Sequence, residues 1–107
     1  KIKAGVAINP DTDIKFLEPY IKQVDMILIM SVFPGEGGQK FLSSTFEKIK
    51  LLNQYKMKNN FKISVDGGVN NLNSEKLHSL YSDILVSGSF LVKNEDIKIA
   101  VKSLLNK

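Results

Sequence analysis

The chain carries a glycine-rich loop with the composition of a ligand-binding site. After Pro34 it has three glycines within four residues, at Gly35, Gly37 and Gly38, interrupted only by Glu36. Residues without side chains leave the main chain open to close approach by another molecule. We therefore expect a ligand at this loop, although a plain connection between a strand and a helix is the alternative.

Glycines follow an apolar run at two further places. Asp66 is followed by Gly67 and Gly68, and the run that ends near Ser87 is followed by Gly88 and Ser89. If these runs are parallel strands, all three loops meet at one edge of the sheet. Asp-Gly-Gly is also common turn chemistry, so on the pattern alone a turn or capping role for Asp66 stays open.

The charged residues limit how such a loop could hold an anion. The net charge of +4 comes from lysine, because the 107-residue chain contains no arginine. Any phosphate must therefore be held by backbone N–H groups, hydroxyls or a lysine ammonium. Lys40, beside the glycine loop, is the lysine we would test. The other lysines are scattered with no aromatic residues arranged between them, so we expect no nucleic-acid partner.

Composition bounds the class of protein. A chain of this length with 43% apolar residues can bury one small core. It has no cysteine, which is compatible with a reducing compartment, and it shows no signal peptide or transmembrane run. We expect a cytoplasmic protein without a membrane partner. Its one histidine, His78, falls in a predicted helix, and we expect it at the surface away from any strand end.

Apolar runs and apolar periodicity predict strands and helices in alternation. The runs predict strands at residues 3–9, 26–32, 62–65 and 83–87. Spacing near 3.6 predicts a helix after each strand, with Pro19 breaking the first and Asn94 able to cap the last. The expected inward positions are Phe16, Leu17, Tyr20, Ile21 and Val24; Leu42, Phe46, Ile49 and Leu52; Leu72, Leu77, Leu80 and Tyr81; and Ile97, Ala100, Val101, Leu104 and Leu105.

This order predicts an α/β fold with parallel strands and right-handed crossovers. Four βα units of about 25 residues each are half of an eight-unit barrel. We therefore expect a (β/α)8 TIM-barrel family member in which this chain forms a half barrel. An open four-stranded sheet is the alternative. In both architectures the ligand binds at the C-terminal ends of the strands.

Three motifs, in the right order and each at a predicted strand end, resemble the ribulose-phosphate 3-epimerase family. They are M-S-V-F-P-G-E-G-G-Q-K-F at residues 30–41, V-D-G-G-V at 65–69 and V-S-G-S at 86–89. They are similar to that family's M-T-V-x-P-G-F-G-G-Q-x-F, V-D-G-G-[IV] and [VA]-[AS]-G-S. The resemblance covers essentially all 107 residues and implies that residues 1–107 are the C-terminal half of one TIM-barrel epimerase domain.

The resemblance implies epimerisation at C3 of D-ribulose 5-phosphate to D-xylulose 5-phosphate, in the pentose phosphate pathway. Inverting a carbon beside a ketone needs two acid/base groups and a positive charge near the enediolate. The resemblance assigns Asp66 as catalytic carboxylate and metal ligand, with zinc, iron, manganese or cobalt as the divalent cofactor. Met30 would be an apolar lid. The substrate and its phosphate would bind at Gly35, Glu36, Gly37, Gly38, Gly67, Gly68, Gly88 and Ser89.

Two departures from the family pattern matter. Glu36 stands where the family has an aromatic residue, and because a carboxylate would repel a phosphate we expect it to point to solvent. The family's other metal ligands, a His and an Asp on one early strand and a His on the next, have no equivalent here. We therefore expect the 107-residue chain by itself to be inactive.

Other functions stay open on the sequence. An epimerase for a ketohexose 6-phosphate such as allulose 6-phosphate would carry the same motifs. A phosphate-binding or assembly module without catalysis is a different class, and two copies could pair into a barrel with two Asp66 side chains at one rim. We expect a sugar-phosphate substrate and a homo-oligomer.

Overall fold

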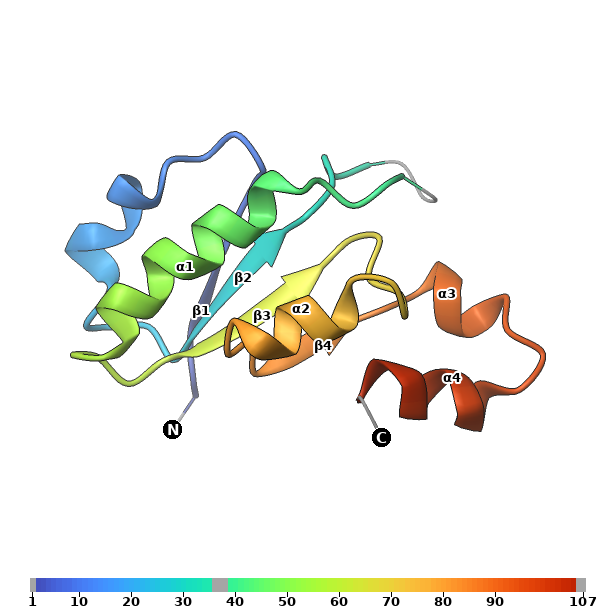
Figure 1. Ribbon diagram of the computed structural model, residues 1–107. Helices are drawn as coiled ribbons and strands as arrows, with labels where there is room; N and C mark the ends of the chain where they lie inside the picture. Colours follow the sequence, from blue (N-terminus) through green and yellow to red (C-terminus); the bar gives the residue numbers. More distant parts are fainter. Residues whose placement is uncertain (1, 36–38, 106–107) are drawn as a thin grey trace.

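The structure is a computed structural model that describes residues 2–35 and 39–105. Four parallel strands form one sheet, in which each strand pairs with the next along the chain. In Figure 1 the arrowheads of the second and third strands point to the same end of the sheet. The strands are β1 (Gly5–Ile8), β2 (Met26–Met30), β3 (Lys62–Asp66) and β4 (Ile84–Val86). The four predicted strands are thus confirmed, with small shifts at their ends.

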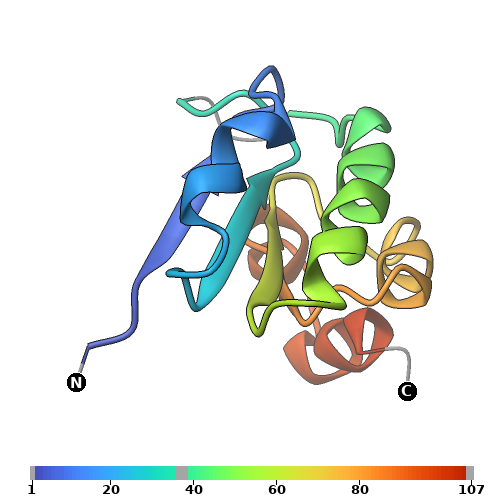
Figure 2. The same cartoon turned by 90° about the vertical axis from the view of Figure 1, so that its left-hand side faces the viewer.

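Helices follow every strand, as predicted. They are η1 (Ile14–Tyr20), α1 (Ser44–Lys56), α2 (Ser74–Ser79), α3 (Ser89–Val92) and α4 (Ile97–Leu104). The fourth strand is followed by two helices where the pattern predicted one, because the short α3 precedes α4. Helices α1 and α2 lie in front of the sheet in Figure 1, and the turned view in Figure 2 keeps them on one side of the strands.

The core lies between the sheet and these helices. Ile8, Ile29, Val65 and Leu85 are register partners in one row across the four strands. The first three are buried and Leu85 is partly buried against the same core. Buried side chains from η1, α1 and α2 complete the layer, among them Leu17, Ile49, Leu52 and Leu77. Helices on one face of a parallel sheet follow from the βα connections.

The opposite face of the sheet is mostly apolar and partly open, with Ser64 buried near its centre. Ala7 is exposed, Leu28 is half-buried, and Ile84 and Val86 on β4 are 43% and 40% exposed. Within the described residues, β1 and β4 each pair with one neighbour, so both are edge strands. Parallel sheets are normally covered on both faces. In the part of the chain that the structure describes, the arrangement is therefore that of a barrel half with a partly open inner face and two edge strands.

The first helix departs from the predicted pattern because it is a 3-10 helix. Its tighter turn of three residues brings Ile14 and Leu17 into the core. Phe16 and Tyr20, predicted to point inward, are 72% and 55% exposed, so those two predictions were wrong. The helix ends one residue after Pro19, where the sequence predicted a break.

Later helices also expose residues predicted to point inward. Leu72 precedes α2 and Tyr81 follows it, and both side chains are mainly exposed because the helix itself covers only six residues. On α4, Ile97 and Val101 lie on the exposed side, as does Leu105 just after the helix, while Ala100 and Leu104 are buried. The inward predictions for Leu72, Tyr81, Ile97, Val101 and Leu105 were therefore wrong.

The cap of α4 is also different from the prediction. The Asp96 carboxylate accepts a hydrogen bond from the Ile99 backbone N–H at 3.2 Å, which makes Asp96 the N-cap. The Asn94 side chain instead donates to the Phe90 carbonyl oxygen at 2.8 Å, at the end of α3. Asn94 was predicted as the cap because no pattern in the sequence indicated a separate α3.

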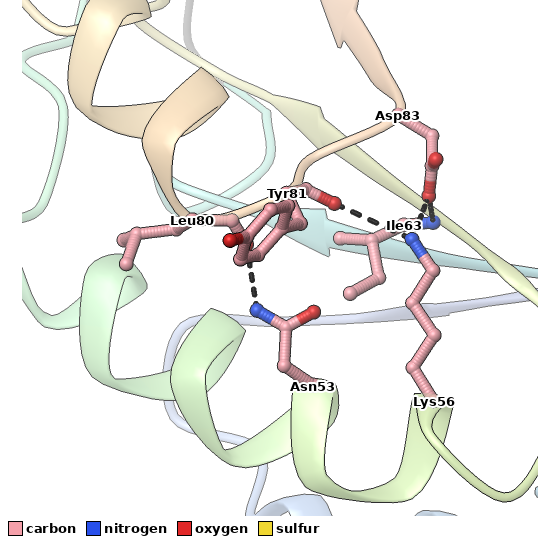
Figure 3. Close-up of polar contacts among 6 residues, drawn as sticks. All are labelled: Asn53, Lys56, Ile63, Leu80, Tyr81 and Asp83. Carbon is pink, nitrogen blue, oxygen red and sulfur yellow. Dashed lines mark hydrogen bonds and ion pairs between the residues drawn. The ribbon is translucent and has the colours of Figure 1, made fainter.

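A polar cluster at the N-terminal end of the strands fastens α1 to the turn before β4 (Figure 3). The Lys56 ammonium forms an ion pair with the Asp83 carboxylate and donates to the Tyr81 carbonyl oxygen at 3.3 Å. The Asn53 amide donates to the Leu80 carbonyl oxygen at 2.6 Å. This end of the sheet lies away from the glycine loops, so the cluster serves stability.

Asp83 supplies the carboxylate of the cluster and has a second partner besides Lys56. It also accepts a hydrogen bond from the Ile63 backbone N–H at 2.9 Å. Partial burial raises its pKa, but the hydrogen bonds from Lys56 and Ile63 and the charges of Lys56 and Lys62 outweigh burial. The net pKa of Asp83 is therefore lowered from its ordinary value of 3.8.

A second anchor holds the loop after β1 at the opposite end of the sheet. The ammonium of Lys48 on α1 donates at 2.9, 2.5 and 2.7 Å to three loop carbonyl oxygens, those of Asn9, Pro10 and Thr12. Partial burial lowers the pKa of this ammonium, against the opposing charges of Asp11 and Asp13. One side chain thereby ties α1 to the first strand-end loop.

Candidate functional site

An open cleft of about 1240 Å³ lies at the C-terminal ends of β2, β3 and β4. Every described residue that the sequence assigned to the site lines this cleft: Met30, Gly35, Asp66, Gly67, Gly68, Gly88 and Ser89. The prediction that three strand ends meet at one rim is therefore confirmed. Glu36, Gly37 and Gly38 lie outside the described residues, and the expected outward orientation of Glu36 stays a prediction.

Asp66 occupies the centre of the rim. Met30, Asp66 and Val86 are register partners on three adjacent strands, at the last position of each. All three line the cleft. The Asp66 side chain is half-buried, and no group among the described residues donates a hydrogen bond to its carboxylate. The carboxylate is thus available to a ligand, with the apolar Met30 side chain next to it.

The backbone that carries Asp66 is held by Ser31, which is fully buried. The Ser31 N–H donates to the Asp66 carbonyl oxygen at 2.8 Å. Its hydroxyl donates to the same oxygen at 2.9 Å and also contacts the Gly67 carbonyl oxygen. Sequence reasoning missed this role, although a hydroxyl at the end of a buried strand inside a motif was the available signal. Ser31 fixes the position of Asp66 from the neighbouring strand.

Gly67 and Gly68 are required for the close approach of two loops. Gly67 has φ +121°, and a Cβ there would lie 2.6 Å from Val32 Cγ2. Gly68 has φ +68°, and its Cβ would lie 2.7 Å from the backbone nitrogen of Phe41. Both conformations favour glycine. These glycines therefore shape the rim by packing against the loop after β2, whether or not their N–H groups also touch a ligand.

Two further side chains tie the strand-end loops together. The Ser87 hydroxyl donates to the Val69 carbonyl oxygen at 2.9 Å, which joins β4 to the loop after β3. The Asn73 amide donates to the Gly68 carbonyl oxygen at 2.9 Å, within that loop. The Ser87 bond links the V-D-G-G-V and V-S-G-S motifs directly, the Asn73 bond holds the turn after Asp66, and neither bond was predicted.

Gly88 and Ser89 form the third part of the rim. Nothing lies within 4 Å of a Cβ built on Gly88, so the backbone there borders open space. Ser89 begins α3, whose first N–H groups have no partner within the helix. Backbone N–H groups that face an open cleft can bind an anion.

Charged side chains lie along the rest of the cleft. Lys40 and Lys93 line it from the loop after β2 and the end of α3, and Glu95 and Asp96 line it from the segment before α4. Lys40 was singled out from the sequence, whereas Lys93 was not.

His78 lies outside the cleft, as expected. It is half-buried, although we predicted a surface position, and its Nε2 lies 2.5 Å from the Leu104 carbonyl oxygen.

The described residues do not make up a metal site by themselves. No group of three or more His, Cys, Asp or Glu side chains that could hold an ion is found in residues 2–35 and 39–105. Asp66 fits as a single ligand, because its carboxylate faces the cleft without a hydrogen-bond donor. The remaining ligands of any ion bound there must come from elsewhere.

A half barrel with a cleft at its strand ends is the architecture of a TIM-barrel protein. Residues 1–92 match the model of the ribulose-phosphate 3 epimerase family, and the chain belongs to this family. Ribulose-phosphate 3-epimerase of Helicobacter pylori is 39% identical over 107 residues, covering 98% of this chain and 49% of the relative. The Chlamydia muridarum enzyme is 37% identical, with 97% and 47% covered, and that of Bacillus subtilis is 37% identical, with 96% and 49% covered.

The chain spans about half the length of the curated relatives it matches. Among solved structures, a chain from a study of the tryptophan synthase complex of Pyrococcus furiosus superimposes with a TM-score of 0.69 at 22% identity. The superposition covers 99% of this chain and 46% of that chain. This likeness shows the fold alone, which is half of a TIM barrel.

Of the helices in the described part of the chain, none combines the length and apolar character needed to cross a membrane.

Proposed function

We propose that residues 1–107 are the C-terminal half of a single TIM-barrel domain that interconverts D-ribulose 5-phosphate and D-xylulose 5-phosphate. The observation that carries this proposal is the placement of Asp66. Its carboxylate has no hydrogen-bond donor among the described residues and lies in register between Met30 and Val86, on a cleft lined by all three family motifs.

The proposed role of Asp66 is proton transfer at C3 of the substrate. Because C3 lies next to the ketone, removing its proton gives an enediolate, and returning a proton to the opposite face inverts the centre. Asp66 serves one face, and a second acid/base group from the complementary half of the barrel serves the other. Met30, one strand away in the same row, covers the reacting carbons and helps to exclude water.

The phosphate is proposed to bind at the backbone of the rim. Gly88 and Ser89 border open space, and the chain has no arginine to form a bidentate contact. Backbone N–H groups and the Ser89 hydroxyl are therefore the proposed ligands, together with the loop that contains Gly35. The rigid links from Ser31 and Ser87 keep these groups at a fixed separation from Asp66.

Metal dependence is part of the proposal, with Asp66 as one ligand and the others from the complementary half. When bound, a divalent zinc, iron, manganese or cobalt ion supplies positive charge next to the substrate oxygens on which negative charge develops. The homo-oligomeric state and the cytoplasmic location expected from the sequence stay predictions.

The open sheet face gives the proposal a sharp test. A fusion would join this chain to the part of the Helicobacter pylori relative that it does not match. Epimerase activity would be measured by coupling xylulose 5-phosphate formation to a spectroscopic assay, with each half alone as control. We expect activity in the fusion and none in either half. A fusion that unfolds cooperatively yet shows no epimerase activity with an added divalent metal would contradict the proposal.

A further inference from the structure

The positive charge available inside the cleft is limited to two side chains. Among the described residues that line it, Lys40 and Lys93 are the cations, while Asp66, Glu95 and Asp96 are the acids. A phosphate dianion needs positive charge as well as N–H groups, and arginine is absent from the sequence. One of these two lysines is therefore expected to supply that charge.

The Lys93 ammonium is not neutralised by the neighbouring acids. In the described part of the chain, ion pairs are formed by Lys50 with Glu47 and by Lys56 with Asp83. Neither Glu95 nor Asp96 lies within ion-pair distance of Lys93, and the Asp96 carboxylate already accepts a hydrogen bond at the start of α4. The charge of Lys93 thus remains available to a ligand in the cleft.

Lys93 lies at the end of the short helix that begins with Ser89, one of the two residues proposed to hold the phosphate. Its N–H donates to the Ser89 carbonyl oxygen at 3.0 Å, so it lies one helical turn after Ser89 on the same side. Side chains on a helix lean toward its N-terminus, over the preceding turn. A lysine stem at this position is therefore expected to reach back toward Gly88 and Ser89, about 5.4 Å along the helix axis.

We propose that Lys93 is the residue that pairs electrostatically with the substrate phosphate held at Gly88 and Ser89. This inference rests on the proposed function and adds a determinant of affinity to it. Lys40 is the weaker candidate because it lies on an irregular loop, whereas α3 fixes the position of Lys93 relative to Ser89. A lysine ammonium acts as a point charge, so its contribution falls as salt rises.

The test is a titration of the isotope-labelled 107-residue chain with inorganic phosphate and with D-ribulose 5-phosphate, followed by backbone amide NMR. We expect the Gly88 and Ser89 amides to shift in the parent chain. Lys93→Gln should raise the dissociation constant about fivefold, the upper range for an exposed charge pair. It should also flatten the dependence of binding on salt, and Lys93→Arg should restore both.

Lys98→Gln is the matched control, because it removes the same charge from α4 outside the cleft. Equal binding by Lys93→Gln and Lys98→Gln, with the Gly88 and Ser89 shifts intact, would overturn the role of Lys93 and leave the phosphate site standing. If these two amides do not shift even in the parent chain, the phosphate site of the proposed function fails, and the role of Lys93 fails with it.

Discussion

Gly67→Ala tests whether packing shapes the turn that carries Asp66. At φ +121° an alanine is strained, and its Cβ would lie 2.6 Å from Val32 Cγ2 and 3.0 Å from the Val32 backbone nitrogen. The backbone conformation costs about 1–3 kcal/mol, and the forced overpacking adds about 1–3 kcal/mol. Because Gly67→Ala incurs both costs and they add, we expect the free energy of unfolding to fall by about 2–6 kcal/mol.

Gly88→Ala is the control for the same chemical change at the same rim. Its φ is −106°, and no atom lies within 4 Å of the added Cβ. The unfolding free energy should change by no more than about 1 kcal/mol. Urea unfolding followed by far-UV circular dichroism measures both variants, and failure of Gly67→Ala to fold would agree with the expectation. Equal stability of the two variants would refute the packing argument.

Three other perturbations test the contacts around the site. Ser31→Ala should cost about 1–3 kcal/mol of unfolding free energy because it removes the buried hydroxyl that bonds the Asp66 carbonyl, whereas Ser31→Thr should retain stability; urea unfolding of the pair decides this. Because the pKa of Asp83 is lowered in the folded state, its ion pair stabilises the fold above pH 3.8 and this contribution is lost as pH falls below that value. The urea midpoint of Asp83→Asn should therefore depend less on acidic pH than that of the parent, and parallel curves would contradict the assignment. Lys48→Met should leave three carbonyls of the loop after β1 without their donor and lower stability by about 1–3 kcal/mol; an unchanged urea midpoint would show that the loop does not depend on Lys48.

The positions of the strand ends followed from local sequence. An apolar run followed by glycine marks the end of a buried strand, and this pattern occurs at each of the three loops that line the cleft. Parallel pairing then requires these ends to lie at one edge, which is why Asp66, Gly88 and Ser89 were assigned to one site. Their placement could be predicted because the βα order leaves few alternatives.

Contacts between distant segments could not be predicted in the same way. The bonds from Ser31 to the Asp66 and Gly67 carbonyls join positions 35 and 36 residues apart, and the local pattern marks only the Ser31 hydroxyl, not its distant partners. The steric need for glycine at Gly68 comes from the approach of Phe41, which also depends on tertiary packing. Such contacts appear only once the loops are placed side by side.

Helix faces were less predictable where helices are short. The four-residue α3 is too brief to show an apolar period, so Lys93 was not recognised as a residue of the cleft. Tyr81 has φ 65° at the turn after α2, which directs the chain into β4 and leaves the ring exposed. The 3.6-residue period also fails for Phe16 because η1 is a 3-10 helix.

The most direct test of the role of Asp66 is hydrogen exchange at C3 of D-ribulose 5-phosphate in D₂O, followed by NMR. The comparison is between the Helicobacter pylori fusion and its Asp66→Asn variant, which changes the carboxylate with little change in shape. We expect exchange to slow by at least about a hundredfold, while the phosphate-induced shift of the Ser89 amide remains. Exchange at a near-normal rate in Asp66→Asn would contradict it.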